Sequence, residues 1–157
     1  MALSGLSHLD DSGAAHMVDV TAKTATKRTA VARGSVHTRA DVIELIAGGG
    51  LPKGDALPTA RVAGIMAAKR TSDLIPLCHQ LALTGVDVEF DIGTTEVTIT
   101  ATVRTTDRTG VEMEALTAVS VAALTVYDMI KAVDPAARID GVHVVRKEGG
   151  KTGTWTP

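Results

Sequence analysis

The chain has 157 residues, of which 45% are hydrophobic and only 2% aromatic, and its formal net charge is -2. This length predicts one domain of ordinary size, with a core of aliphatic rather than aromatic side chains. Few aromatic platforms for stacking bases and a slightly acidic charge balance argue against a nucleic-acid partner.

A single cysteine, Cys78, excludes an internal disulfide. The N-terminus lacks the charged segment and apolar core of a secretion signal, and the apolar runs look too short to span a bilayer. We therefore expect a cytoplasmic protein without a membrane partner. Residues 1–16, with their Ser, Gly and Asp, are expected to form a flexible arm before a single domain over residues 17–157. The two histidines of the arm, His8 and His16, are too scattered to predict a metal site.

The first half of the chain predicts one strand and two helices. Residues 27–38 alternate loosely between small or β-branched and polar side chains, as in a strand. Residues 38–48 predict a short helix, and residues 60–70 predict a second helix whose small side chains permit close packing. Between them lies a glycine-rich loop, residues 48–55, which carries Lys53 but lacks the Walker spacing of a phosphate loop.

The second half predicts a β-hairpin over residues 81–92 and 95–106, in which apolar and polar residues alternate on either side of a Gly-Thr turn. A long helix over residues 110–131 follows, and residues 141–147 predict a final strand. This order indicates an α+β, ferredoxin-like βαββαβ fold, with helices packed on one face of an antiparallel sheet. Such a fold hosts many functions and cannot choose among them.

The long helix carries ionisable side chains within an apolar run. Glu114, Asp128 and Lys131 share one stripe at about 100° per residue, and the aliphatic residues around it predict burial on several sides. Asp128 and Lys131 are one turn apart and can touch, whereas Glu114 lies about 21 Å from Asp128 along the axis. Either the two acids bind different ends of a long ligand, or two subunits pack this helix antiparallel and share their sites. The simpler alternative for Asp128 and Lys131 is a surface ion pair near a helix end.

Residues 74–79, Leu-Ile-Pro-Leu-Cys-His, place the only cysteine directly before His79. A structural zinc site needs four ligands at spaced positions, and the chain has no second cysteine, so we predict no metal here. One interpretation is a histidine satisfied by its neighbours beside a buried thiol. The alternative is that His79 binds an anion.

Basic residues stand beside glycines or helix ends in several segments. Lys53, Lys69 and Lys147 fit this description, and Arg28 lies at the start of the first predicted strand. Cations on flexible loops of a slightly acidic protein predict a local pocket for a small polyanion such as a nucleotide phosphate. Solvated surface lysines are the alternative. The acid and base on the long helix add the means for proton transfer, which favours the pocket.

Seven motifs in the same order resemble the cyclic pyranopterin monophosphate synthase family of molybdenum cofactor biosynthesis, from about His16 to Gly153. They are His16-Met-Val-Asp-Val, Lys53-Gly-Asp, Ala60-Arg-Val-Ala-Gly-Ile-Met-Ala-Ala-Lys, Leu74-Ile-Pro-Leu-Cys-His, Thr109-Gly-Val-Glu-Met-Glu-Ala-Leu-Thr, Tyr127-Asp-Met and Gly149-Gly-Lys. Each motif alone is weak, but together and in order they are specific.

The resemblance implies a lyase that converts 3',8-cyclo-7,8-dihydroguanosine triphosphate into cyclic pyranopterin monophosphate and releases diphosphate, with no metal or organic cofactor. It implies a catalytic role for Asp128, helped by Lys131 and Lys53. The residues expected to bind this small-molecule substrate are Leu77, Cys78, His79, Met113, Glu114 and Lys69, with Arg28 and Lys147 on its phosphates. The family also implies a homo-oligomer, a hexamer built as a trimer of dimers with sites at the dimer interface.

Three positions depart from the family's usual pattern. Gln80 replaces a proline, Ile130 a cysteine and Glu148 a serine. Glu148 matters most, because a carboxylate beside Lys147 would weaken a phosphate contact there. Two other classes compete with an enzyme: a non-catalytic module that senses a nucleotide, and a structural oligomer whose charges form interfaces.

Overall fold

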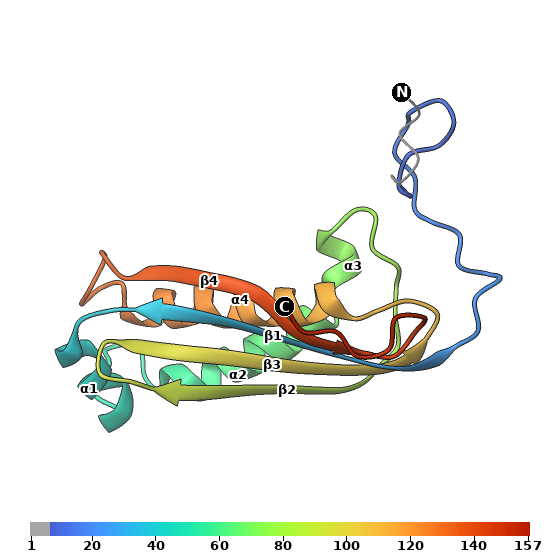
Figure 1. Ribbon diagram of the computed structural model, residues 1–157. Helices are drawn as coiled ribbons and strands as arrows, with labels where there is room; N and C mark the ends of the chain where they lie inside the picture. Colours follow the sequence, from blue (N-terminus) through green and yellow to red (C-terminus); the bar gives the residue numbers. More distant parts are fainter. Residues whose placement is uncertain (1–6) are drawn as a thin grey trace.

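The computed structural model describes residues 7–157, and Figure 1 shows the course of the chain. Its elements are β1 (Thr26–His37), α1 (Ala40–Gly48), α2 (Ala56–Ala68), α3 (Thr71–Leu74), β2 (Leu83–Ile92), β3 (Glu96–Asp107), α4 (Glu112–Ile130) and β4 (Arg138–Glu148). Each predicted strand and helix is present, although α2 and β4 begin earlier than predicted. No sequence pattern predicted the short α3, which precedes Cys78.

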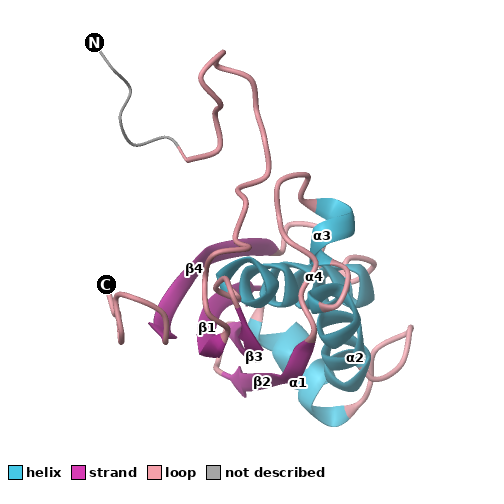
Figure 2. Cartoon of the chain, turned by 90° about the vertical axis from the view of Figure 1, so that its right-hand side faces the viewer, coloured by secondary structure: helices cyan, strands magenta, loops and turns pink. Residues whose placement is uncertain are grey.

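The four strands form one sheet in the order β2-β3-β1-β4, and each neighbouring pair is antiparallel. The central strands β1 and β3 pair along their whole lengths, from Thr26 opposite Asp107 to His37 opposite Glu96. Helices α1, α2 and α4 lie on one side of the sheet (Figure 2). The predicted ferredoxin-like α+β fold is confirmed.

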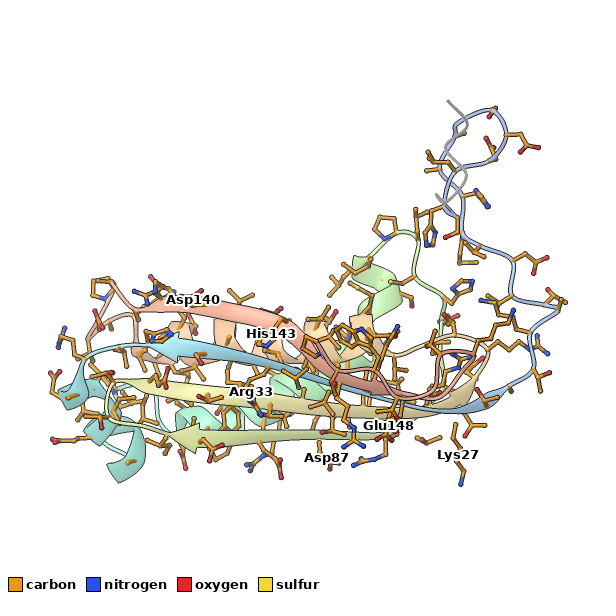
Figure 3. The ribbon with its side chains drawn as sticks, viewed as in Figure 1. Lys27, Arg33, Asp87, Asp140, His143 and Glu148 are labelled. Carbon is orange, nitrogen blue, oxygen red and sulfur yellow. The ribbon has the colours of Figure 1, made fainter. Side chains whose placement is uncertain are left out.

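Alternation along the central strands separates the two faces of the sheet. Every second residue is buried from Ala30 to Val36 in β1 and from Val97 to Thr105 in β3, and the residues between them face the open side. The buried hydrophobic set is Ala30, Ala32, Val36, Val97, Ile99, Ala101 and Val103. The open face carries threonines and charged side chains, including Arg33 and Asp87 (Figure 3). This is the period of two that a half-buried strand imposes on its side chains.

Helix α4 is the central helix of the molecule. It packs against β1, β3, β4 and α2, and its buried residues include Val119 and Val126. A Cβ built on Gly34 of β1 would lie 2.9 Å from Val119 Cγ1. A Cβ on Gly64 of α2 would lie 3.0 Å from the Ala118 carbonyl oxygen. Glycines therefore let both neighbours approach α4 closely.

By length and composition alone, α4 is apolar enough to cross a membrane. The prediction that every apolar run is too short to do so is therefore wrong. Much of α4 is buried against the sheet and α2, as in the core helix of a globular domain, so its composition is weak evidence for a membrane span.

Residues 7–25 extend as a loop away from the sheet and helices (Figures 1 and 2). A bridge joins Leu9 to Ala15 within this segment. The segment contacts the fold where His79 Nε2 donates to the Val18 carbonyl oxygen at 2.5 Å. Flexibility of the arm over residues 1–16 stays a prediction, and its first six residues lie outside the described part of the chain.

Candidate active site

Three predicted catalytic residues meet at the C-terminal end of α4. Asp128 lies on the last turn of the helix, and Lys131 is its C-cap. The Lys131 ammonium lies 2.8 Å from Asp128 Oδ1, and the Lys53 ammonium lies 3.1 Å from Asp128 Oδ2. The carboxylate is therefore held between two cations, one from its own helix and one from a distant loop.

Lys53 reaches Asp128 from a turn between α1 and α2. Leu51 anchors this turn in the core, and the Gly54 N–H donates to the Leu51 carbonyl oxygen at 3.1 Å. Gly54 has a φ of 98°, a left-handed conformation that glycine adopts without strain. The glycine-rich loop thus presents Lys53 at the end of α4.

Both lysines stabilise the charged form of Asp128. Hydrogen bonds from Lys131 and then from Lys53 lower the pKa of Asp128, and Asp128 in turn raises the pKa of Lys131. At neutral pH the cluster is a carboxylate flanked by two ammonium groups. It can accept a proton on the carboxylate, return one from an ammonium group and hold a phosphate oxygen.

The stripe that leads to this cluster is not buried along its whole length. Glu114, at the start of α4, is 4% exposed, whereas Leu124 is 56% exposed and the Asp128 side chain 52% exposed. The prediction of burial is therefore wrong for the C-terminal half of the stripe, because the sheet and α2 cover only the other sides of α4 there. In a single chain the lysine–aspartate cluster is open to solvent.

A second group of predicted residues lies at the other end of α4, where a cavity of about 530 Å³ opens. The segment after α3 forms one wall, the first turn of α4 forms another, and the N-terminal loop contributes Val18 and Val20. The predicted substrate-binding residues that line this cavity are Leu77, Cys78, His79, Met113 and Glu114. The structure thus gathers both motifs around one space.

Burial dominates the acid–base chemistry of Glu114. Burial raises the pKa of Glu114 and the charge of Glu112 adds to the rise, against the lowering effect of a backbone hydrogen bond. The pKa of the Cys78 thiol is also raised, first by burial and then by Glu114. Glu114 therefore stays protonated to a higher pH than an exposed glutamate and can donate a hydrogen bond. Cys78 stays a thiol, which is a poor nucleophile.

His79 stands in the wall of the same cavity, with Nε2 donating to the Val18 carbonyl oxygen. In the neutral ring this contact places the proton on Nε2 and leaves Nδ1 as an acceptor. The interpretation of a histidine satisfied by a neighbour fits this geometry. Anion binding by His79 stays a prediction.

The C-terminal loop closes on Arg28 and Lys147. Arg28 Nε donates to the Asp107 carbonyl oxygen at 3.1 Å. Gly150, where the loop passes the Arg28 guanidinium, has a φ of 73°, a left-handed conformation that favours glycine. The Lys147 ammonium lies 3.2 Å from Glu112 Oε1, a partner that the sequence did not predict. Both predicted phosphate-binding cations therefore lie near the start of α4.

Glu148 does not pair with Lys147. Its carboxylate pairs with Arg146, and in the sheet Glu148 lies opposite Thr29 whereas Lys147 lies opposite Ala30. Neighbouring residues of a strand point to opposite faces, so Lys147 faces the helices and Glu148 the open side. In the described chain, the expected interference of Glu148 with Lys147 does not arise through a direct contact.

Two further lysines, Lys23 and Lys151, join Arg28 around another cavity of about 660 Å³. The residues that line it include no acid and are Ala22, Lys23, Thr24, Thr26, Arg28, Gly150 and Lys151. No sequence pattern gave Lys23 a role, whereas Lys151, which follows two glycines, was among the lysines whose setting predicted a pocket for a polyanion. Lys69 is exposed at the C-cap of α2 and lines neither this cavity nor the one around Glu114.

The two groups stand at opposite ends of one rigid helix. Glu114 and Asp128 are about 21 Å apart along its axis, so a single copy cannot apply both to the same atom. Within residues 7–157, no group of three or more His, Cys, Asp or Glu side chains is placed to hold a metal ion. That the protein needs no metal or cofactor stays a prediction.

The fold and the site define an α+β protein whose central helix carries acid–base groups at both ends. Residues 17–150 match the family described as the MoaC family, and the chain belongs to this family. The cyclic pyranopterin monophosphate synthase 2 of Mycobacterium tuberculosis is 76% identical, over 96% of this chain and 90% of the relative. The cyclic pyranopterin monophosphate synthase of Streptomyces coelicolor is 64% identical, over 96% of this chain and 89% of the relative. That of Roseiflexus castenholzii is 61% identical, over 96% of this chain and 97% of the relative. The resemblance inferred from the motifs is confirmed.

Proposed function

We propose that this protein is a cyclic pyranopterin monophosphate synthase of molybdenum cofactor biosynthesis. It converts (8S)-3',8-cyclo-7,8-dihydroguanosine 5'-triphosphate into cyclic pyranopterin monophosphate and releases diphosphate. Membership of the MoaC family and the names of relatives up to 76% identical support this function. The observation that carries it is the contact of Asp128 with Lys53 and Lys131, because proton transfer needs a base and an acid within reach of each other.

In this reaction Asp128 takes a proton from the ring system and Lys131 returns one, while Lys53 supplies the second cation of the cluster. Closure of the cyclic phosphate forms a bond from a sugar oxygen to the first phosphorus and breaks the bond from that phosphorus to the leaving diphosphate. Negative charge develops on the leaving group. Ammonium and guanidinium groups fixed near it stabilise the transition state.

The cavity around Glu114 is the proposed binding site for the ring system. It is lined on one side by Leu77, Cys78 and His79, and a protonated Glu114 suits an acceptor atom of the ring. The phosphates are assigned to the cations near the C-terminal loop, which are Arg28, Lys147, Lys23 and Lys151. Met113 and Lys69 complete the proposed substrate contacts, and Lys69 lacks support from a cavity in the single chain.

A second copy of the chain would complete each site. If two α4 helices pack antiparallel, Glu114 of one copy approaches Asp128 of the other. The two residues can then act in one site although they lie far apart along a single helix. Exposed apolar side chains on α2 and α4, including Val62, Met66 and Leu124, favour such an interface. The assembly we propose is a hexamer made of three dimers. The free thiol of Cys78 favours a reducing, cytoplasmic location.

The test is incubation of the purified protein with the cyclised nucleotide, followed by measurement of diphosphate release. We expect release by the wild type and its loss in Asp128→Asn and Lys131→Ala, with circular dichroism unchanged in both variants. Binding without release by the wild type would indicate a nucleotide sensor instead. Neither binding nor release would indicate a structural oligomer, and either result would overturn the proposal.

A further inference from the structure

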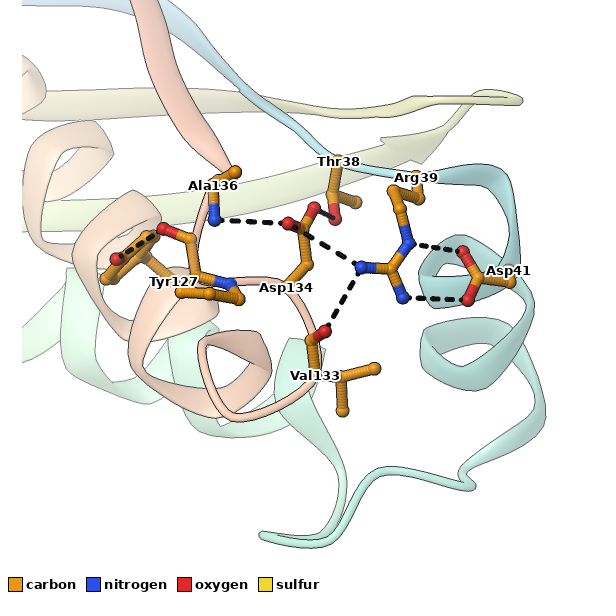
Figure 4. Close-up of polar contacts among 8 residues, drawn as sticks. Thr38, Arg39, Asp41, Tyr127, Val133, Asp134 and Ala136 are labelled. Atoms are coloured by element: carbon orange, nitrogen blue, oxygen red, sulfur yellow. Dashed lines mark hydrogen bonds and ion pairs between the residues drawn. The ribbon is translucent and has the colours of Figure 1, made fainter.

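Asp134 is a buried carboxylate that the proposed reaction does not use. It follows Lys131 closely in the chain, in the turn between α4 and β4, and it is only 5% exposed. Its Oδ2 accepts a hydrogen bond from Thr38 Oγ1 at 2.6 Å, and its Oδ1 accepts one from the Ala136 N–H at 3.1 Å (Figure 4). Arg39 Nη1 lies 3.8 Å from Oδ1. A carboxylate with this many partners fixes the segments from which they come.

Those segments are otherwise distant in the chain. Thr38 directly follows β1, and its N–H donates to the carbonyl oxygen of Thr95, just before β3, at 2.9 Å. Arg39 is the N-cap of α1, and its Nη1 also donates to the Val133 carbonyl oxygen at 3.1 Å. Asp134 thus fastens the start of α1 to the turn that ends α4.

Both fastened segments lead to the catalytic cluster. The Asp134 N–H donates to the Ile130 carbonyl oxygen at 2.9 Å, and the Lys131 N–H to the Tyr127 carbonyl oxygen at 2.8 Å, so the turn is continuous with the helix end that carries Asp128. On the other side, α1 leads through Gly49 and Gly50 to the turn that presents Lys53 on Asp128. Asp134 therefore contacts the start of α1, the helix that leads to Lys53, and lies in the turn that follows Lys131.

We propose that Asp134, with Thr38, is a positioning residue that keeps the ammonium groups of Lys53 and Lys131 in contact with the Asp128 carboxylate. This proposal rests on the proposed function, since it assumes that the cluster performs the proton transfers. Its physical basis is that a displacement of about 1 Å in a catalytic group can cost about 100-fold in rate. A flexible loop alone would not keep a lysine within hydrogen-bond distance of a solvent-exposed carboxylate.

The variant that tests it is Thr38→Val, which removes the hydroxyl donor and keeps the shape of the side chain. The first measurement is the titration of the Asp128 carboxyl carbon by 13C NMR, which needs no substrate. We expect the pKa of Asp128 to rise toward its ordinary value as its contacts with Lys131 and Lys53 loosen. The second is diphosphate release, where we expect kcat to fall about tenfold to 100-fold with KM changed far less.

Two controls separate positioning from stability. Thr38→Ser keeps the hydroxyl and should restore both the titration and kcat. Ile99→Val removes a methyl group from the core under the sheet and destabilises the protein at a place far from Asp134 in the chain. It should lower the melting temperature but leave the pKa of Asp128 and kcat unchanged. Asp134→Asn is the second disruptive variant if Thr38→Val does not fold.

An unchanged Asp128 titration and an unchanged kcat in folded Thr38→Val or Asp134→Asn would overturn the proposal, even if both variants melt earlier. Failure of the proposed function would give a different set of results. The wild type would then release no diphosphate, while the titration of Asp128 would still answer whether the buried carboxylate positions the cluster.

Discussion

The two ends of α4 shift the pKa values of their carboxyl groups in opposite directions. At the N-terminal end, burial raises the pKa of Glu114 and favours its neutral form. At the C-terminal end, Lys131 and Lys53 lower the pKa of Asp128 and favour its charged form. Two carboxyl groups of similar intrinsic acidity are thereby biased in opposite directions, one toward the neutral form that can donate a hydrogen bond and one toward the charged form that only accepts. The environment of each end, rather than the residue type, sets its role.

The largest loss of activity is expected when the charge of Asp128 is removed. Asp128→Asn keeps the shape of the side chain but removes the base, and its NH2 group cannot accept a hydrogen bond from the lysine that it faces. We therefore expect kcat to fall about 100-fold to 10000-fold with little change in KM. Steady-state diphosphate release measures both constants. A variant with more than a tenth of wild-type kcat would show that Asp128 is not the base.

A mixed assembly tests whether the two ends work together across a subunit boundary. Asp128→Asn and Glu114→Ala should each be nearly inactive alone, but co-refolding them in equal amounts creates dimers in which one of the two sites is wild type. Random pairing makes half of the dimers mixed, so activity should return to about a quarter of the wild-type value. Its absence in assemblies that demonstrably contain both variants would place each site within one chain.

The neutral end gives a prediction for stability against pH. A carboxyl group whose pKa is higher in the folded state binds an extra proton there, so its cost to stability is absent below the unfolded pKa and grows as pH rises through the folded pKa. Glu114→Gln removes that cost. Its melting temperature should therefore exceed that of the wild type near pH 8, and the difference should fade near pH 4. Glu112→Gln is the control, because it removes the ion pair with Lys147 and gives no such gain.

A lower melting temperature of Glu114→Gln at neutral pH would contradict this assignment. It would mean that Glu114 is charged in the assembled protein and pairs with a cation from another copy. The contrast between the two ends would then exist only in the isolated chain.

The smallest effect is expected at Glu148. Its carboxylate pairs with Arg146 on the open face of the sheet, away from Lys147. Because an exposed ion pair contributes about 0–1 kcal/mol, Glu148→Ser should change KM less than about fivefold. Lys147→Ala should raise KM well beyond that. A large gain in affinity in Glu148→Ser would show that the carboxylate does act on the bound phosphates.

The sheet could be predicted from the sequence because its strands repeat with a period of two, which is visible in residues 81–106 without any tertiary information. The bounds of the edge strand β4 were harder to predict. Its first residues, Arg138 to Asp140, are polar or partly exposed, and its pairing with β1 contains register shifts. The short α3 depends on Thr71, a buried residue whose hydroxyl donates to the Ala68 carbonyl oxygen at 3.0 Å, and such local contacts leave no periodic signal.

The site was predictable where chemistry follows helix geometry. The contact of Asp128 with Lys131 comes from their spacing on one helix face. The approach of Lys53 depends on chain topology, and only the family resemblance suggested it. The exposure of the C-terminal half of the stripe was missed, because helical periodicity does not reveal which faces α2 and the sheet cover. For the same reason no pattern pointed to the pairing of Lys147 with Glu112.

The chain has one tyrosine and one tryptophan, and they lie near opposite ends of α4. Tyr127 precedes Asp128, and its hydroxyl donates to the Pro135 carbonyl oxygen at 3.0 Å. Trp155 is bridged to Lys147 by backbone hydrogen bonds of 3.0 and 2.8 Å. Intrinsic fluorescence can therefore report on each end without a label. If Tyr127 of one copy approaches Trp155 of another, energy transfer from tyrosine to tryptophan should rise as the copies assemble. Fluorescence of the native side chains would then measure the distance between the two ends of neighbouring α4 helices.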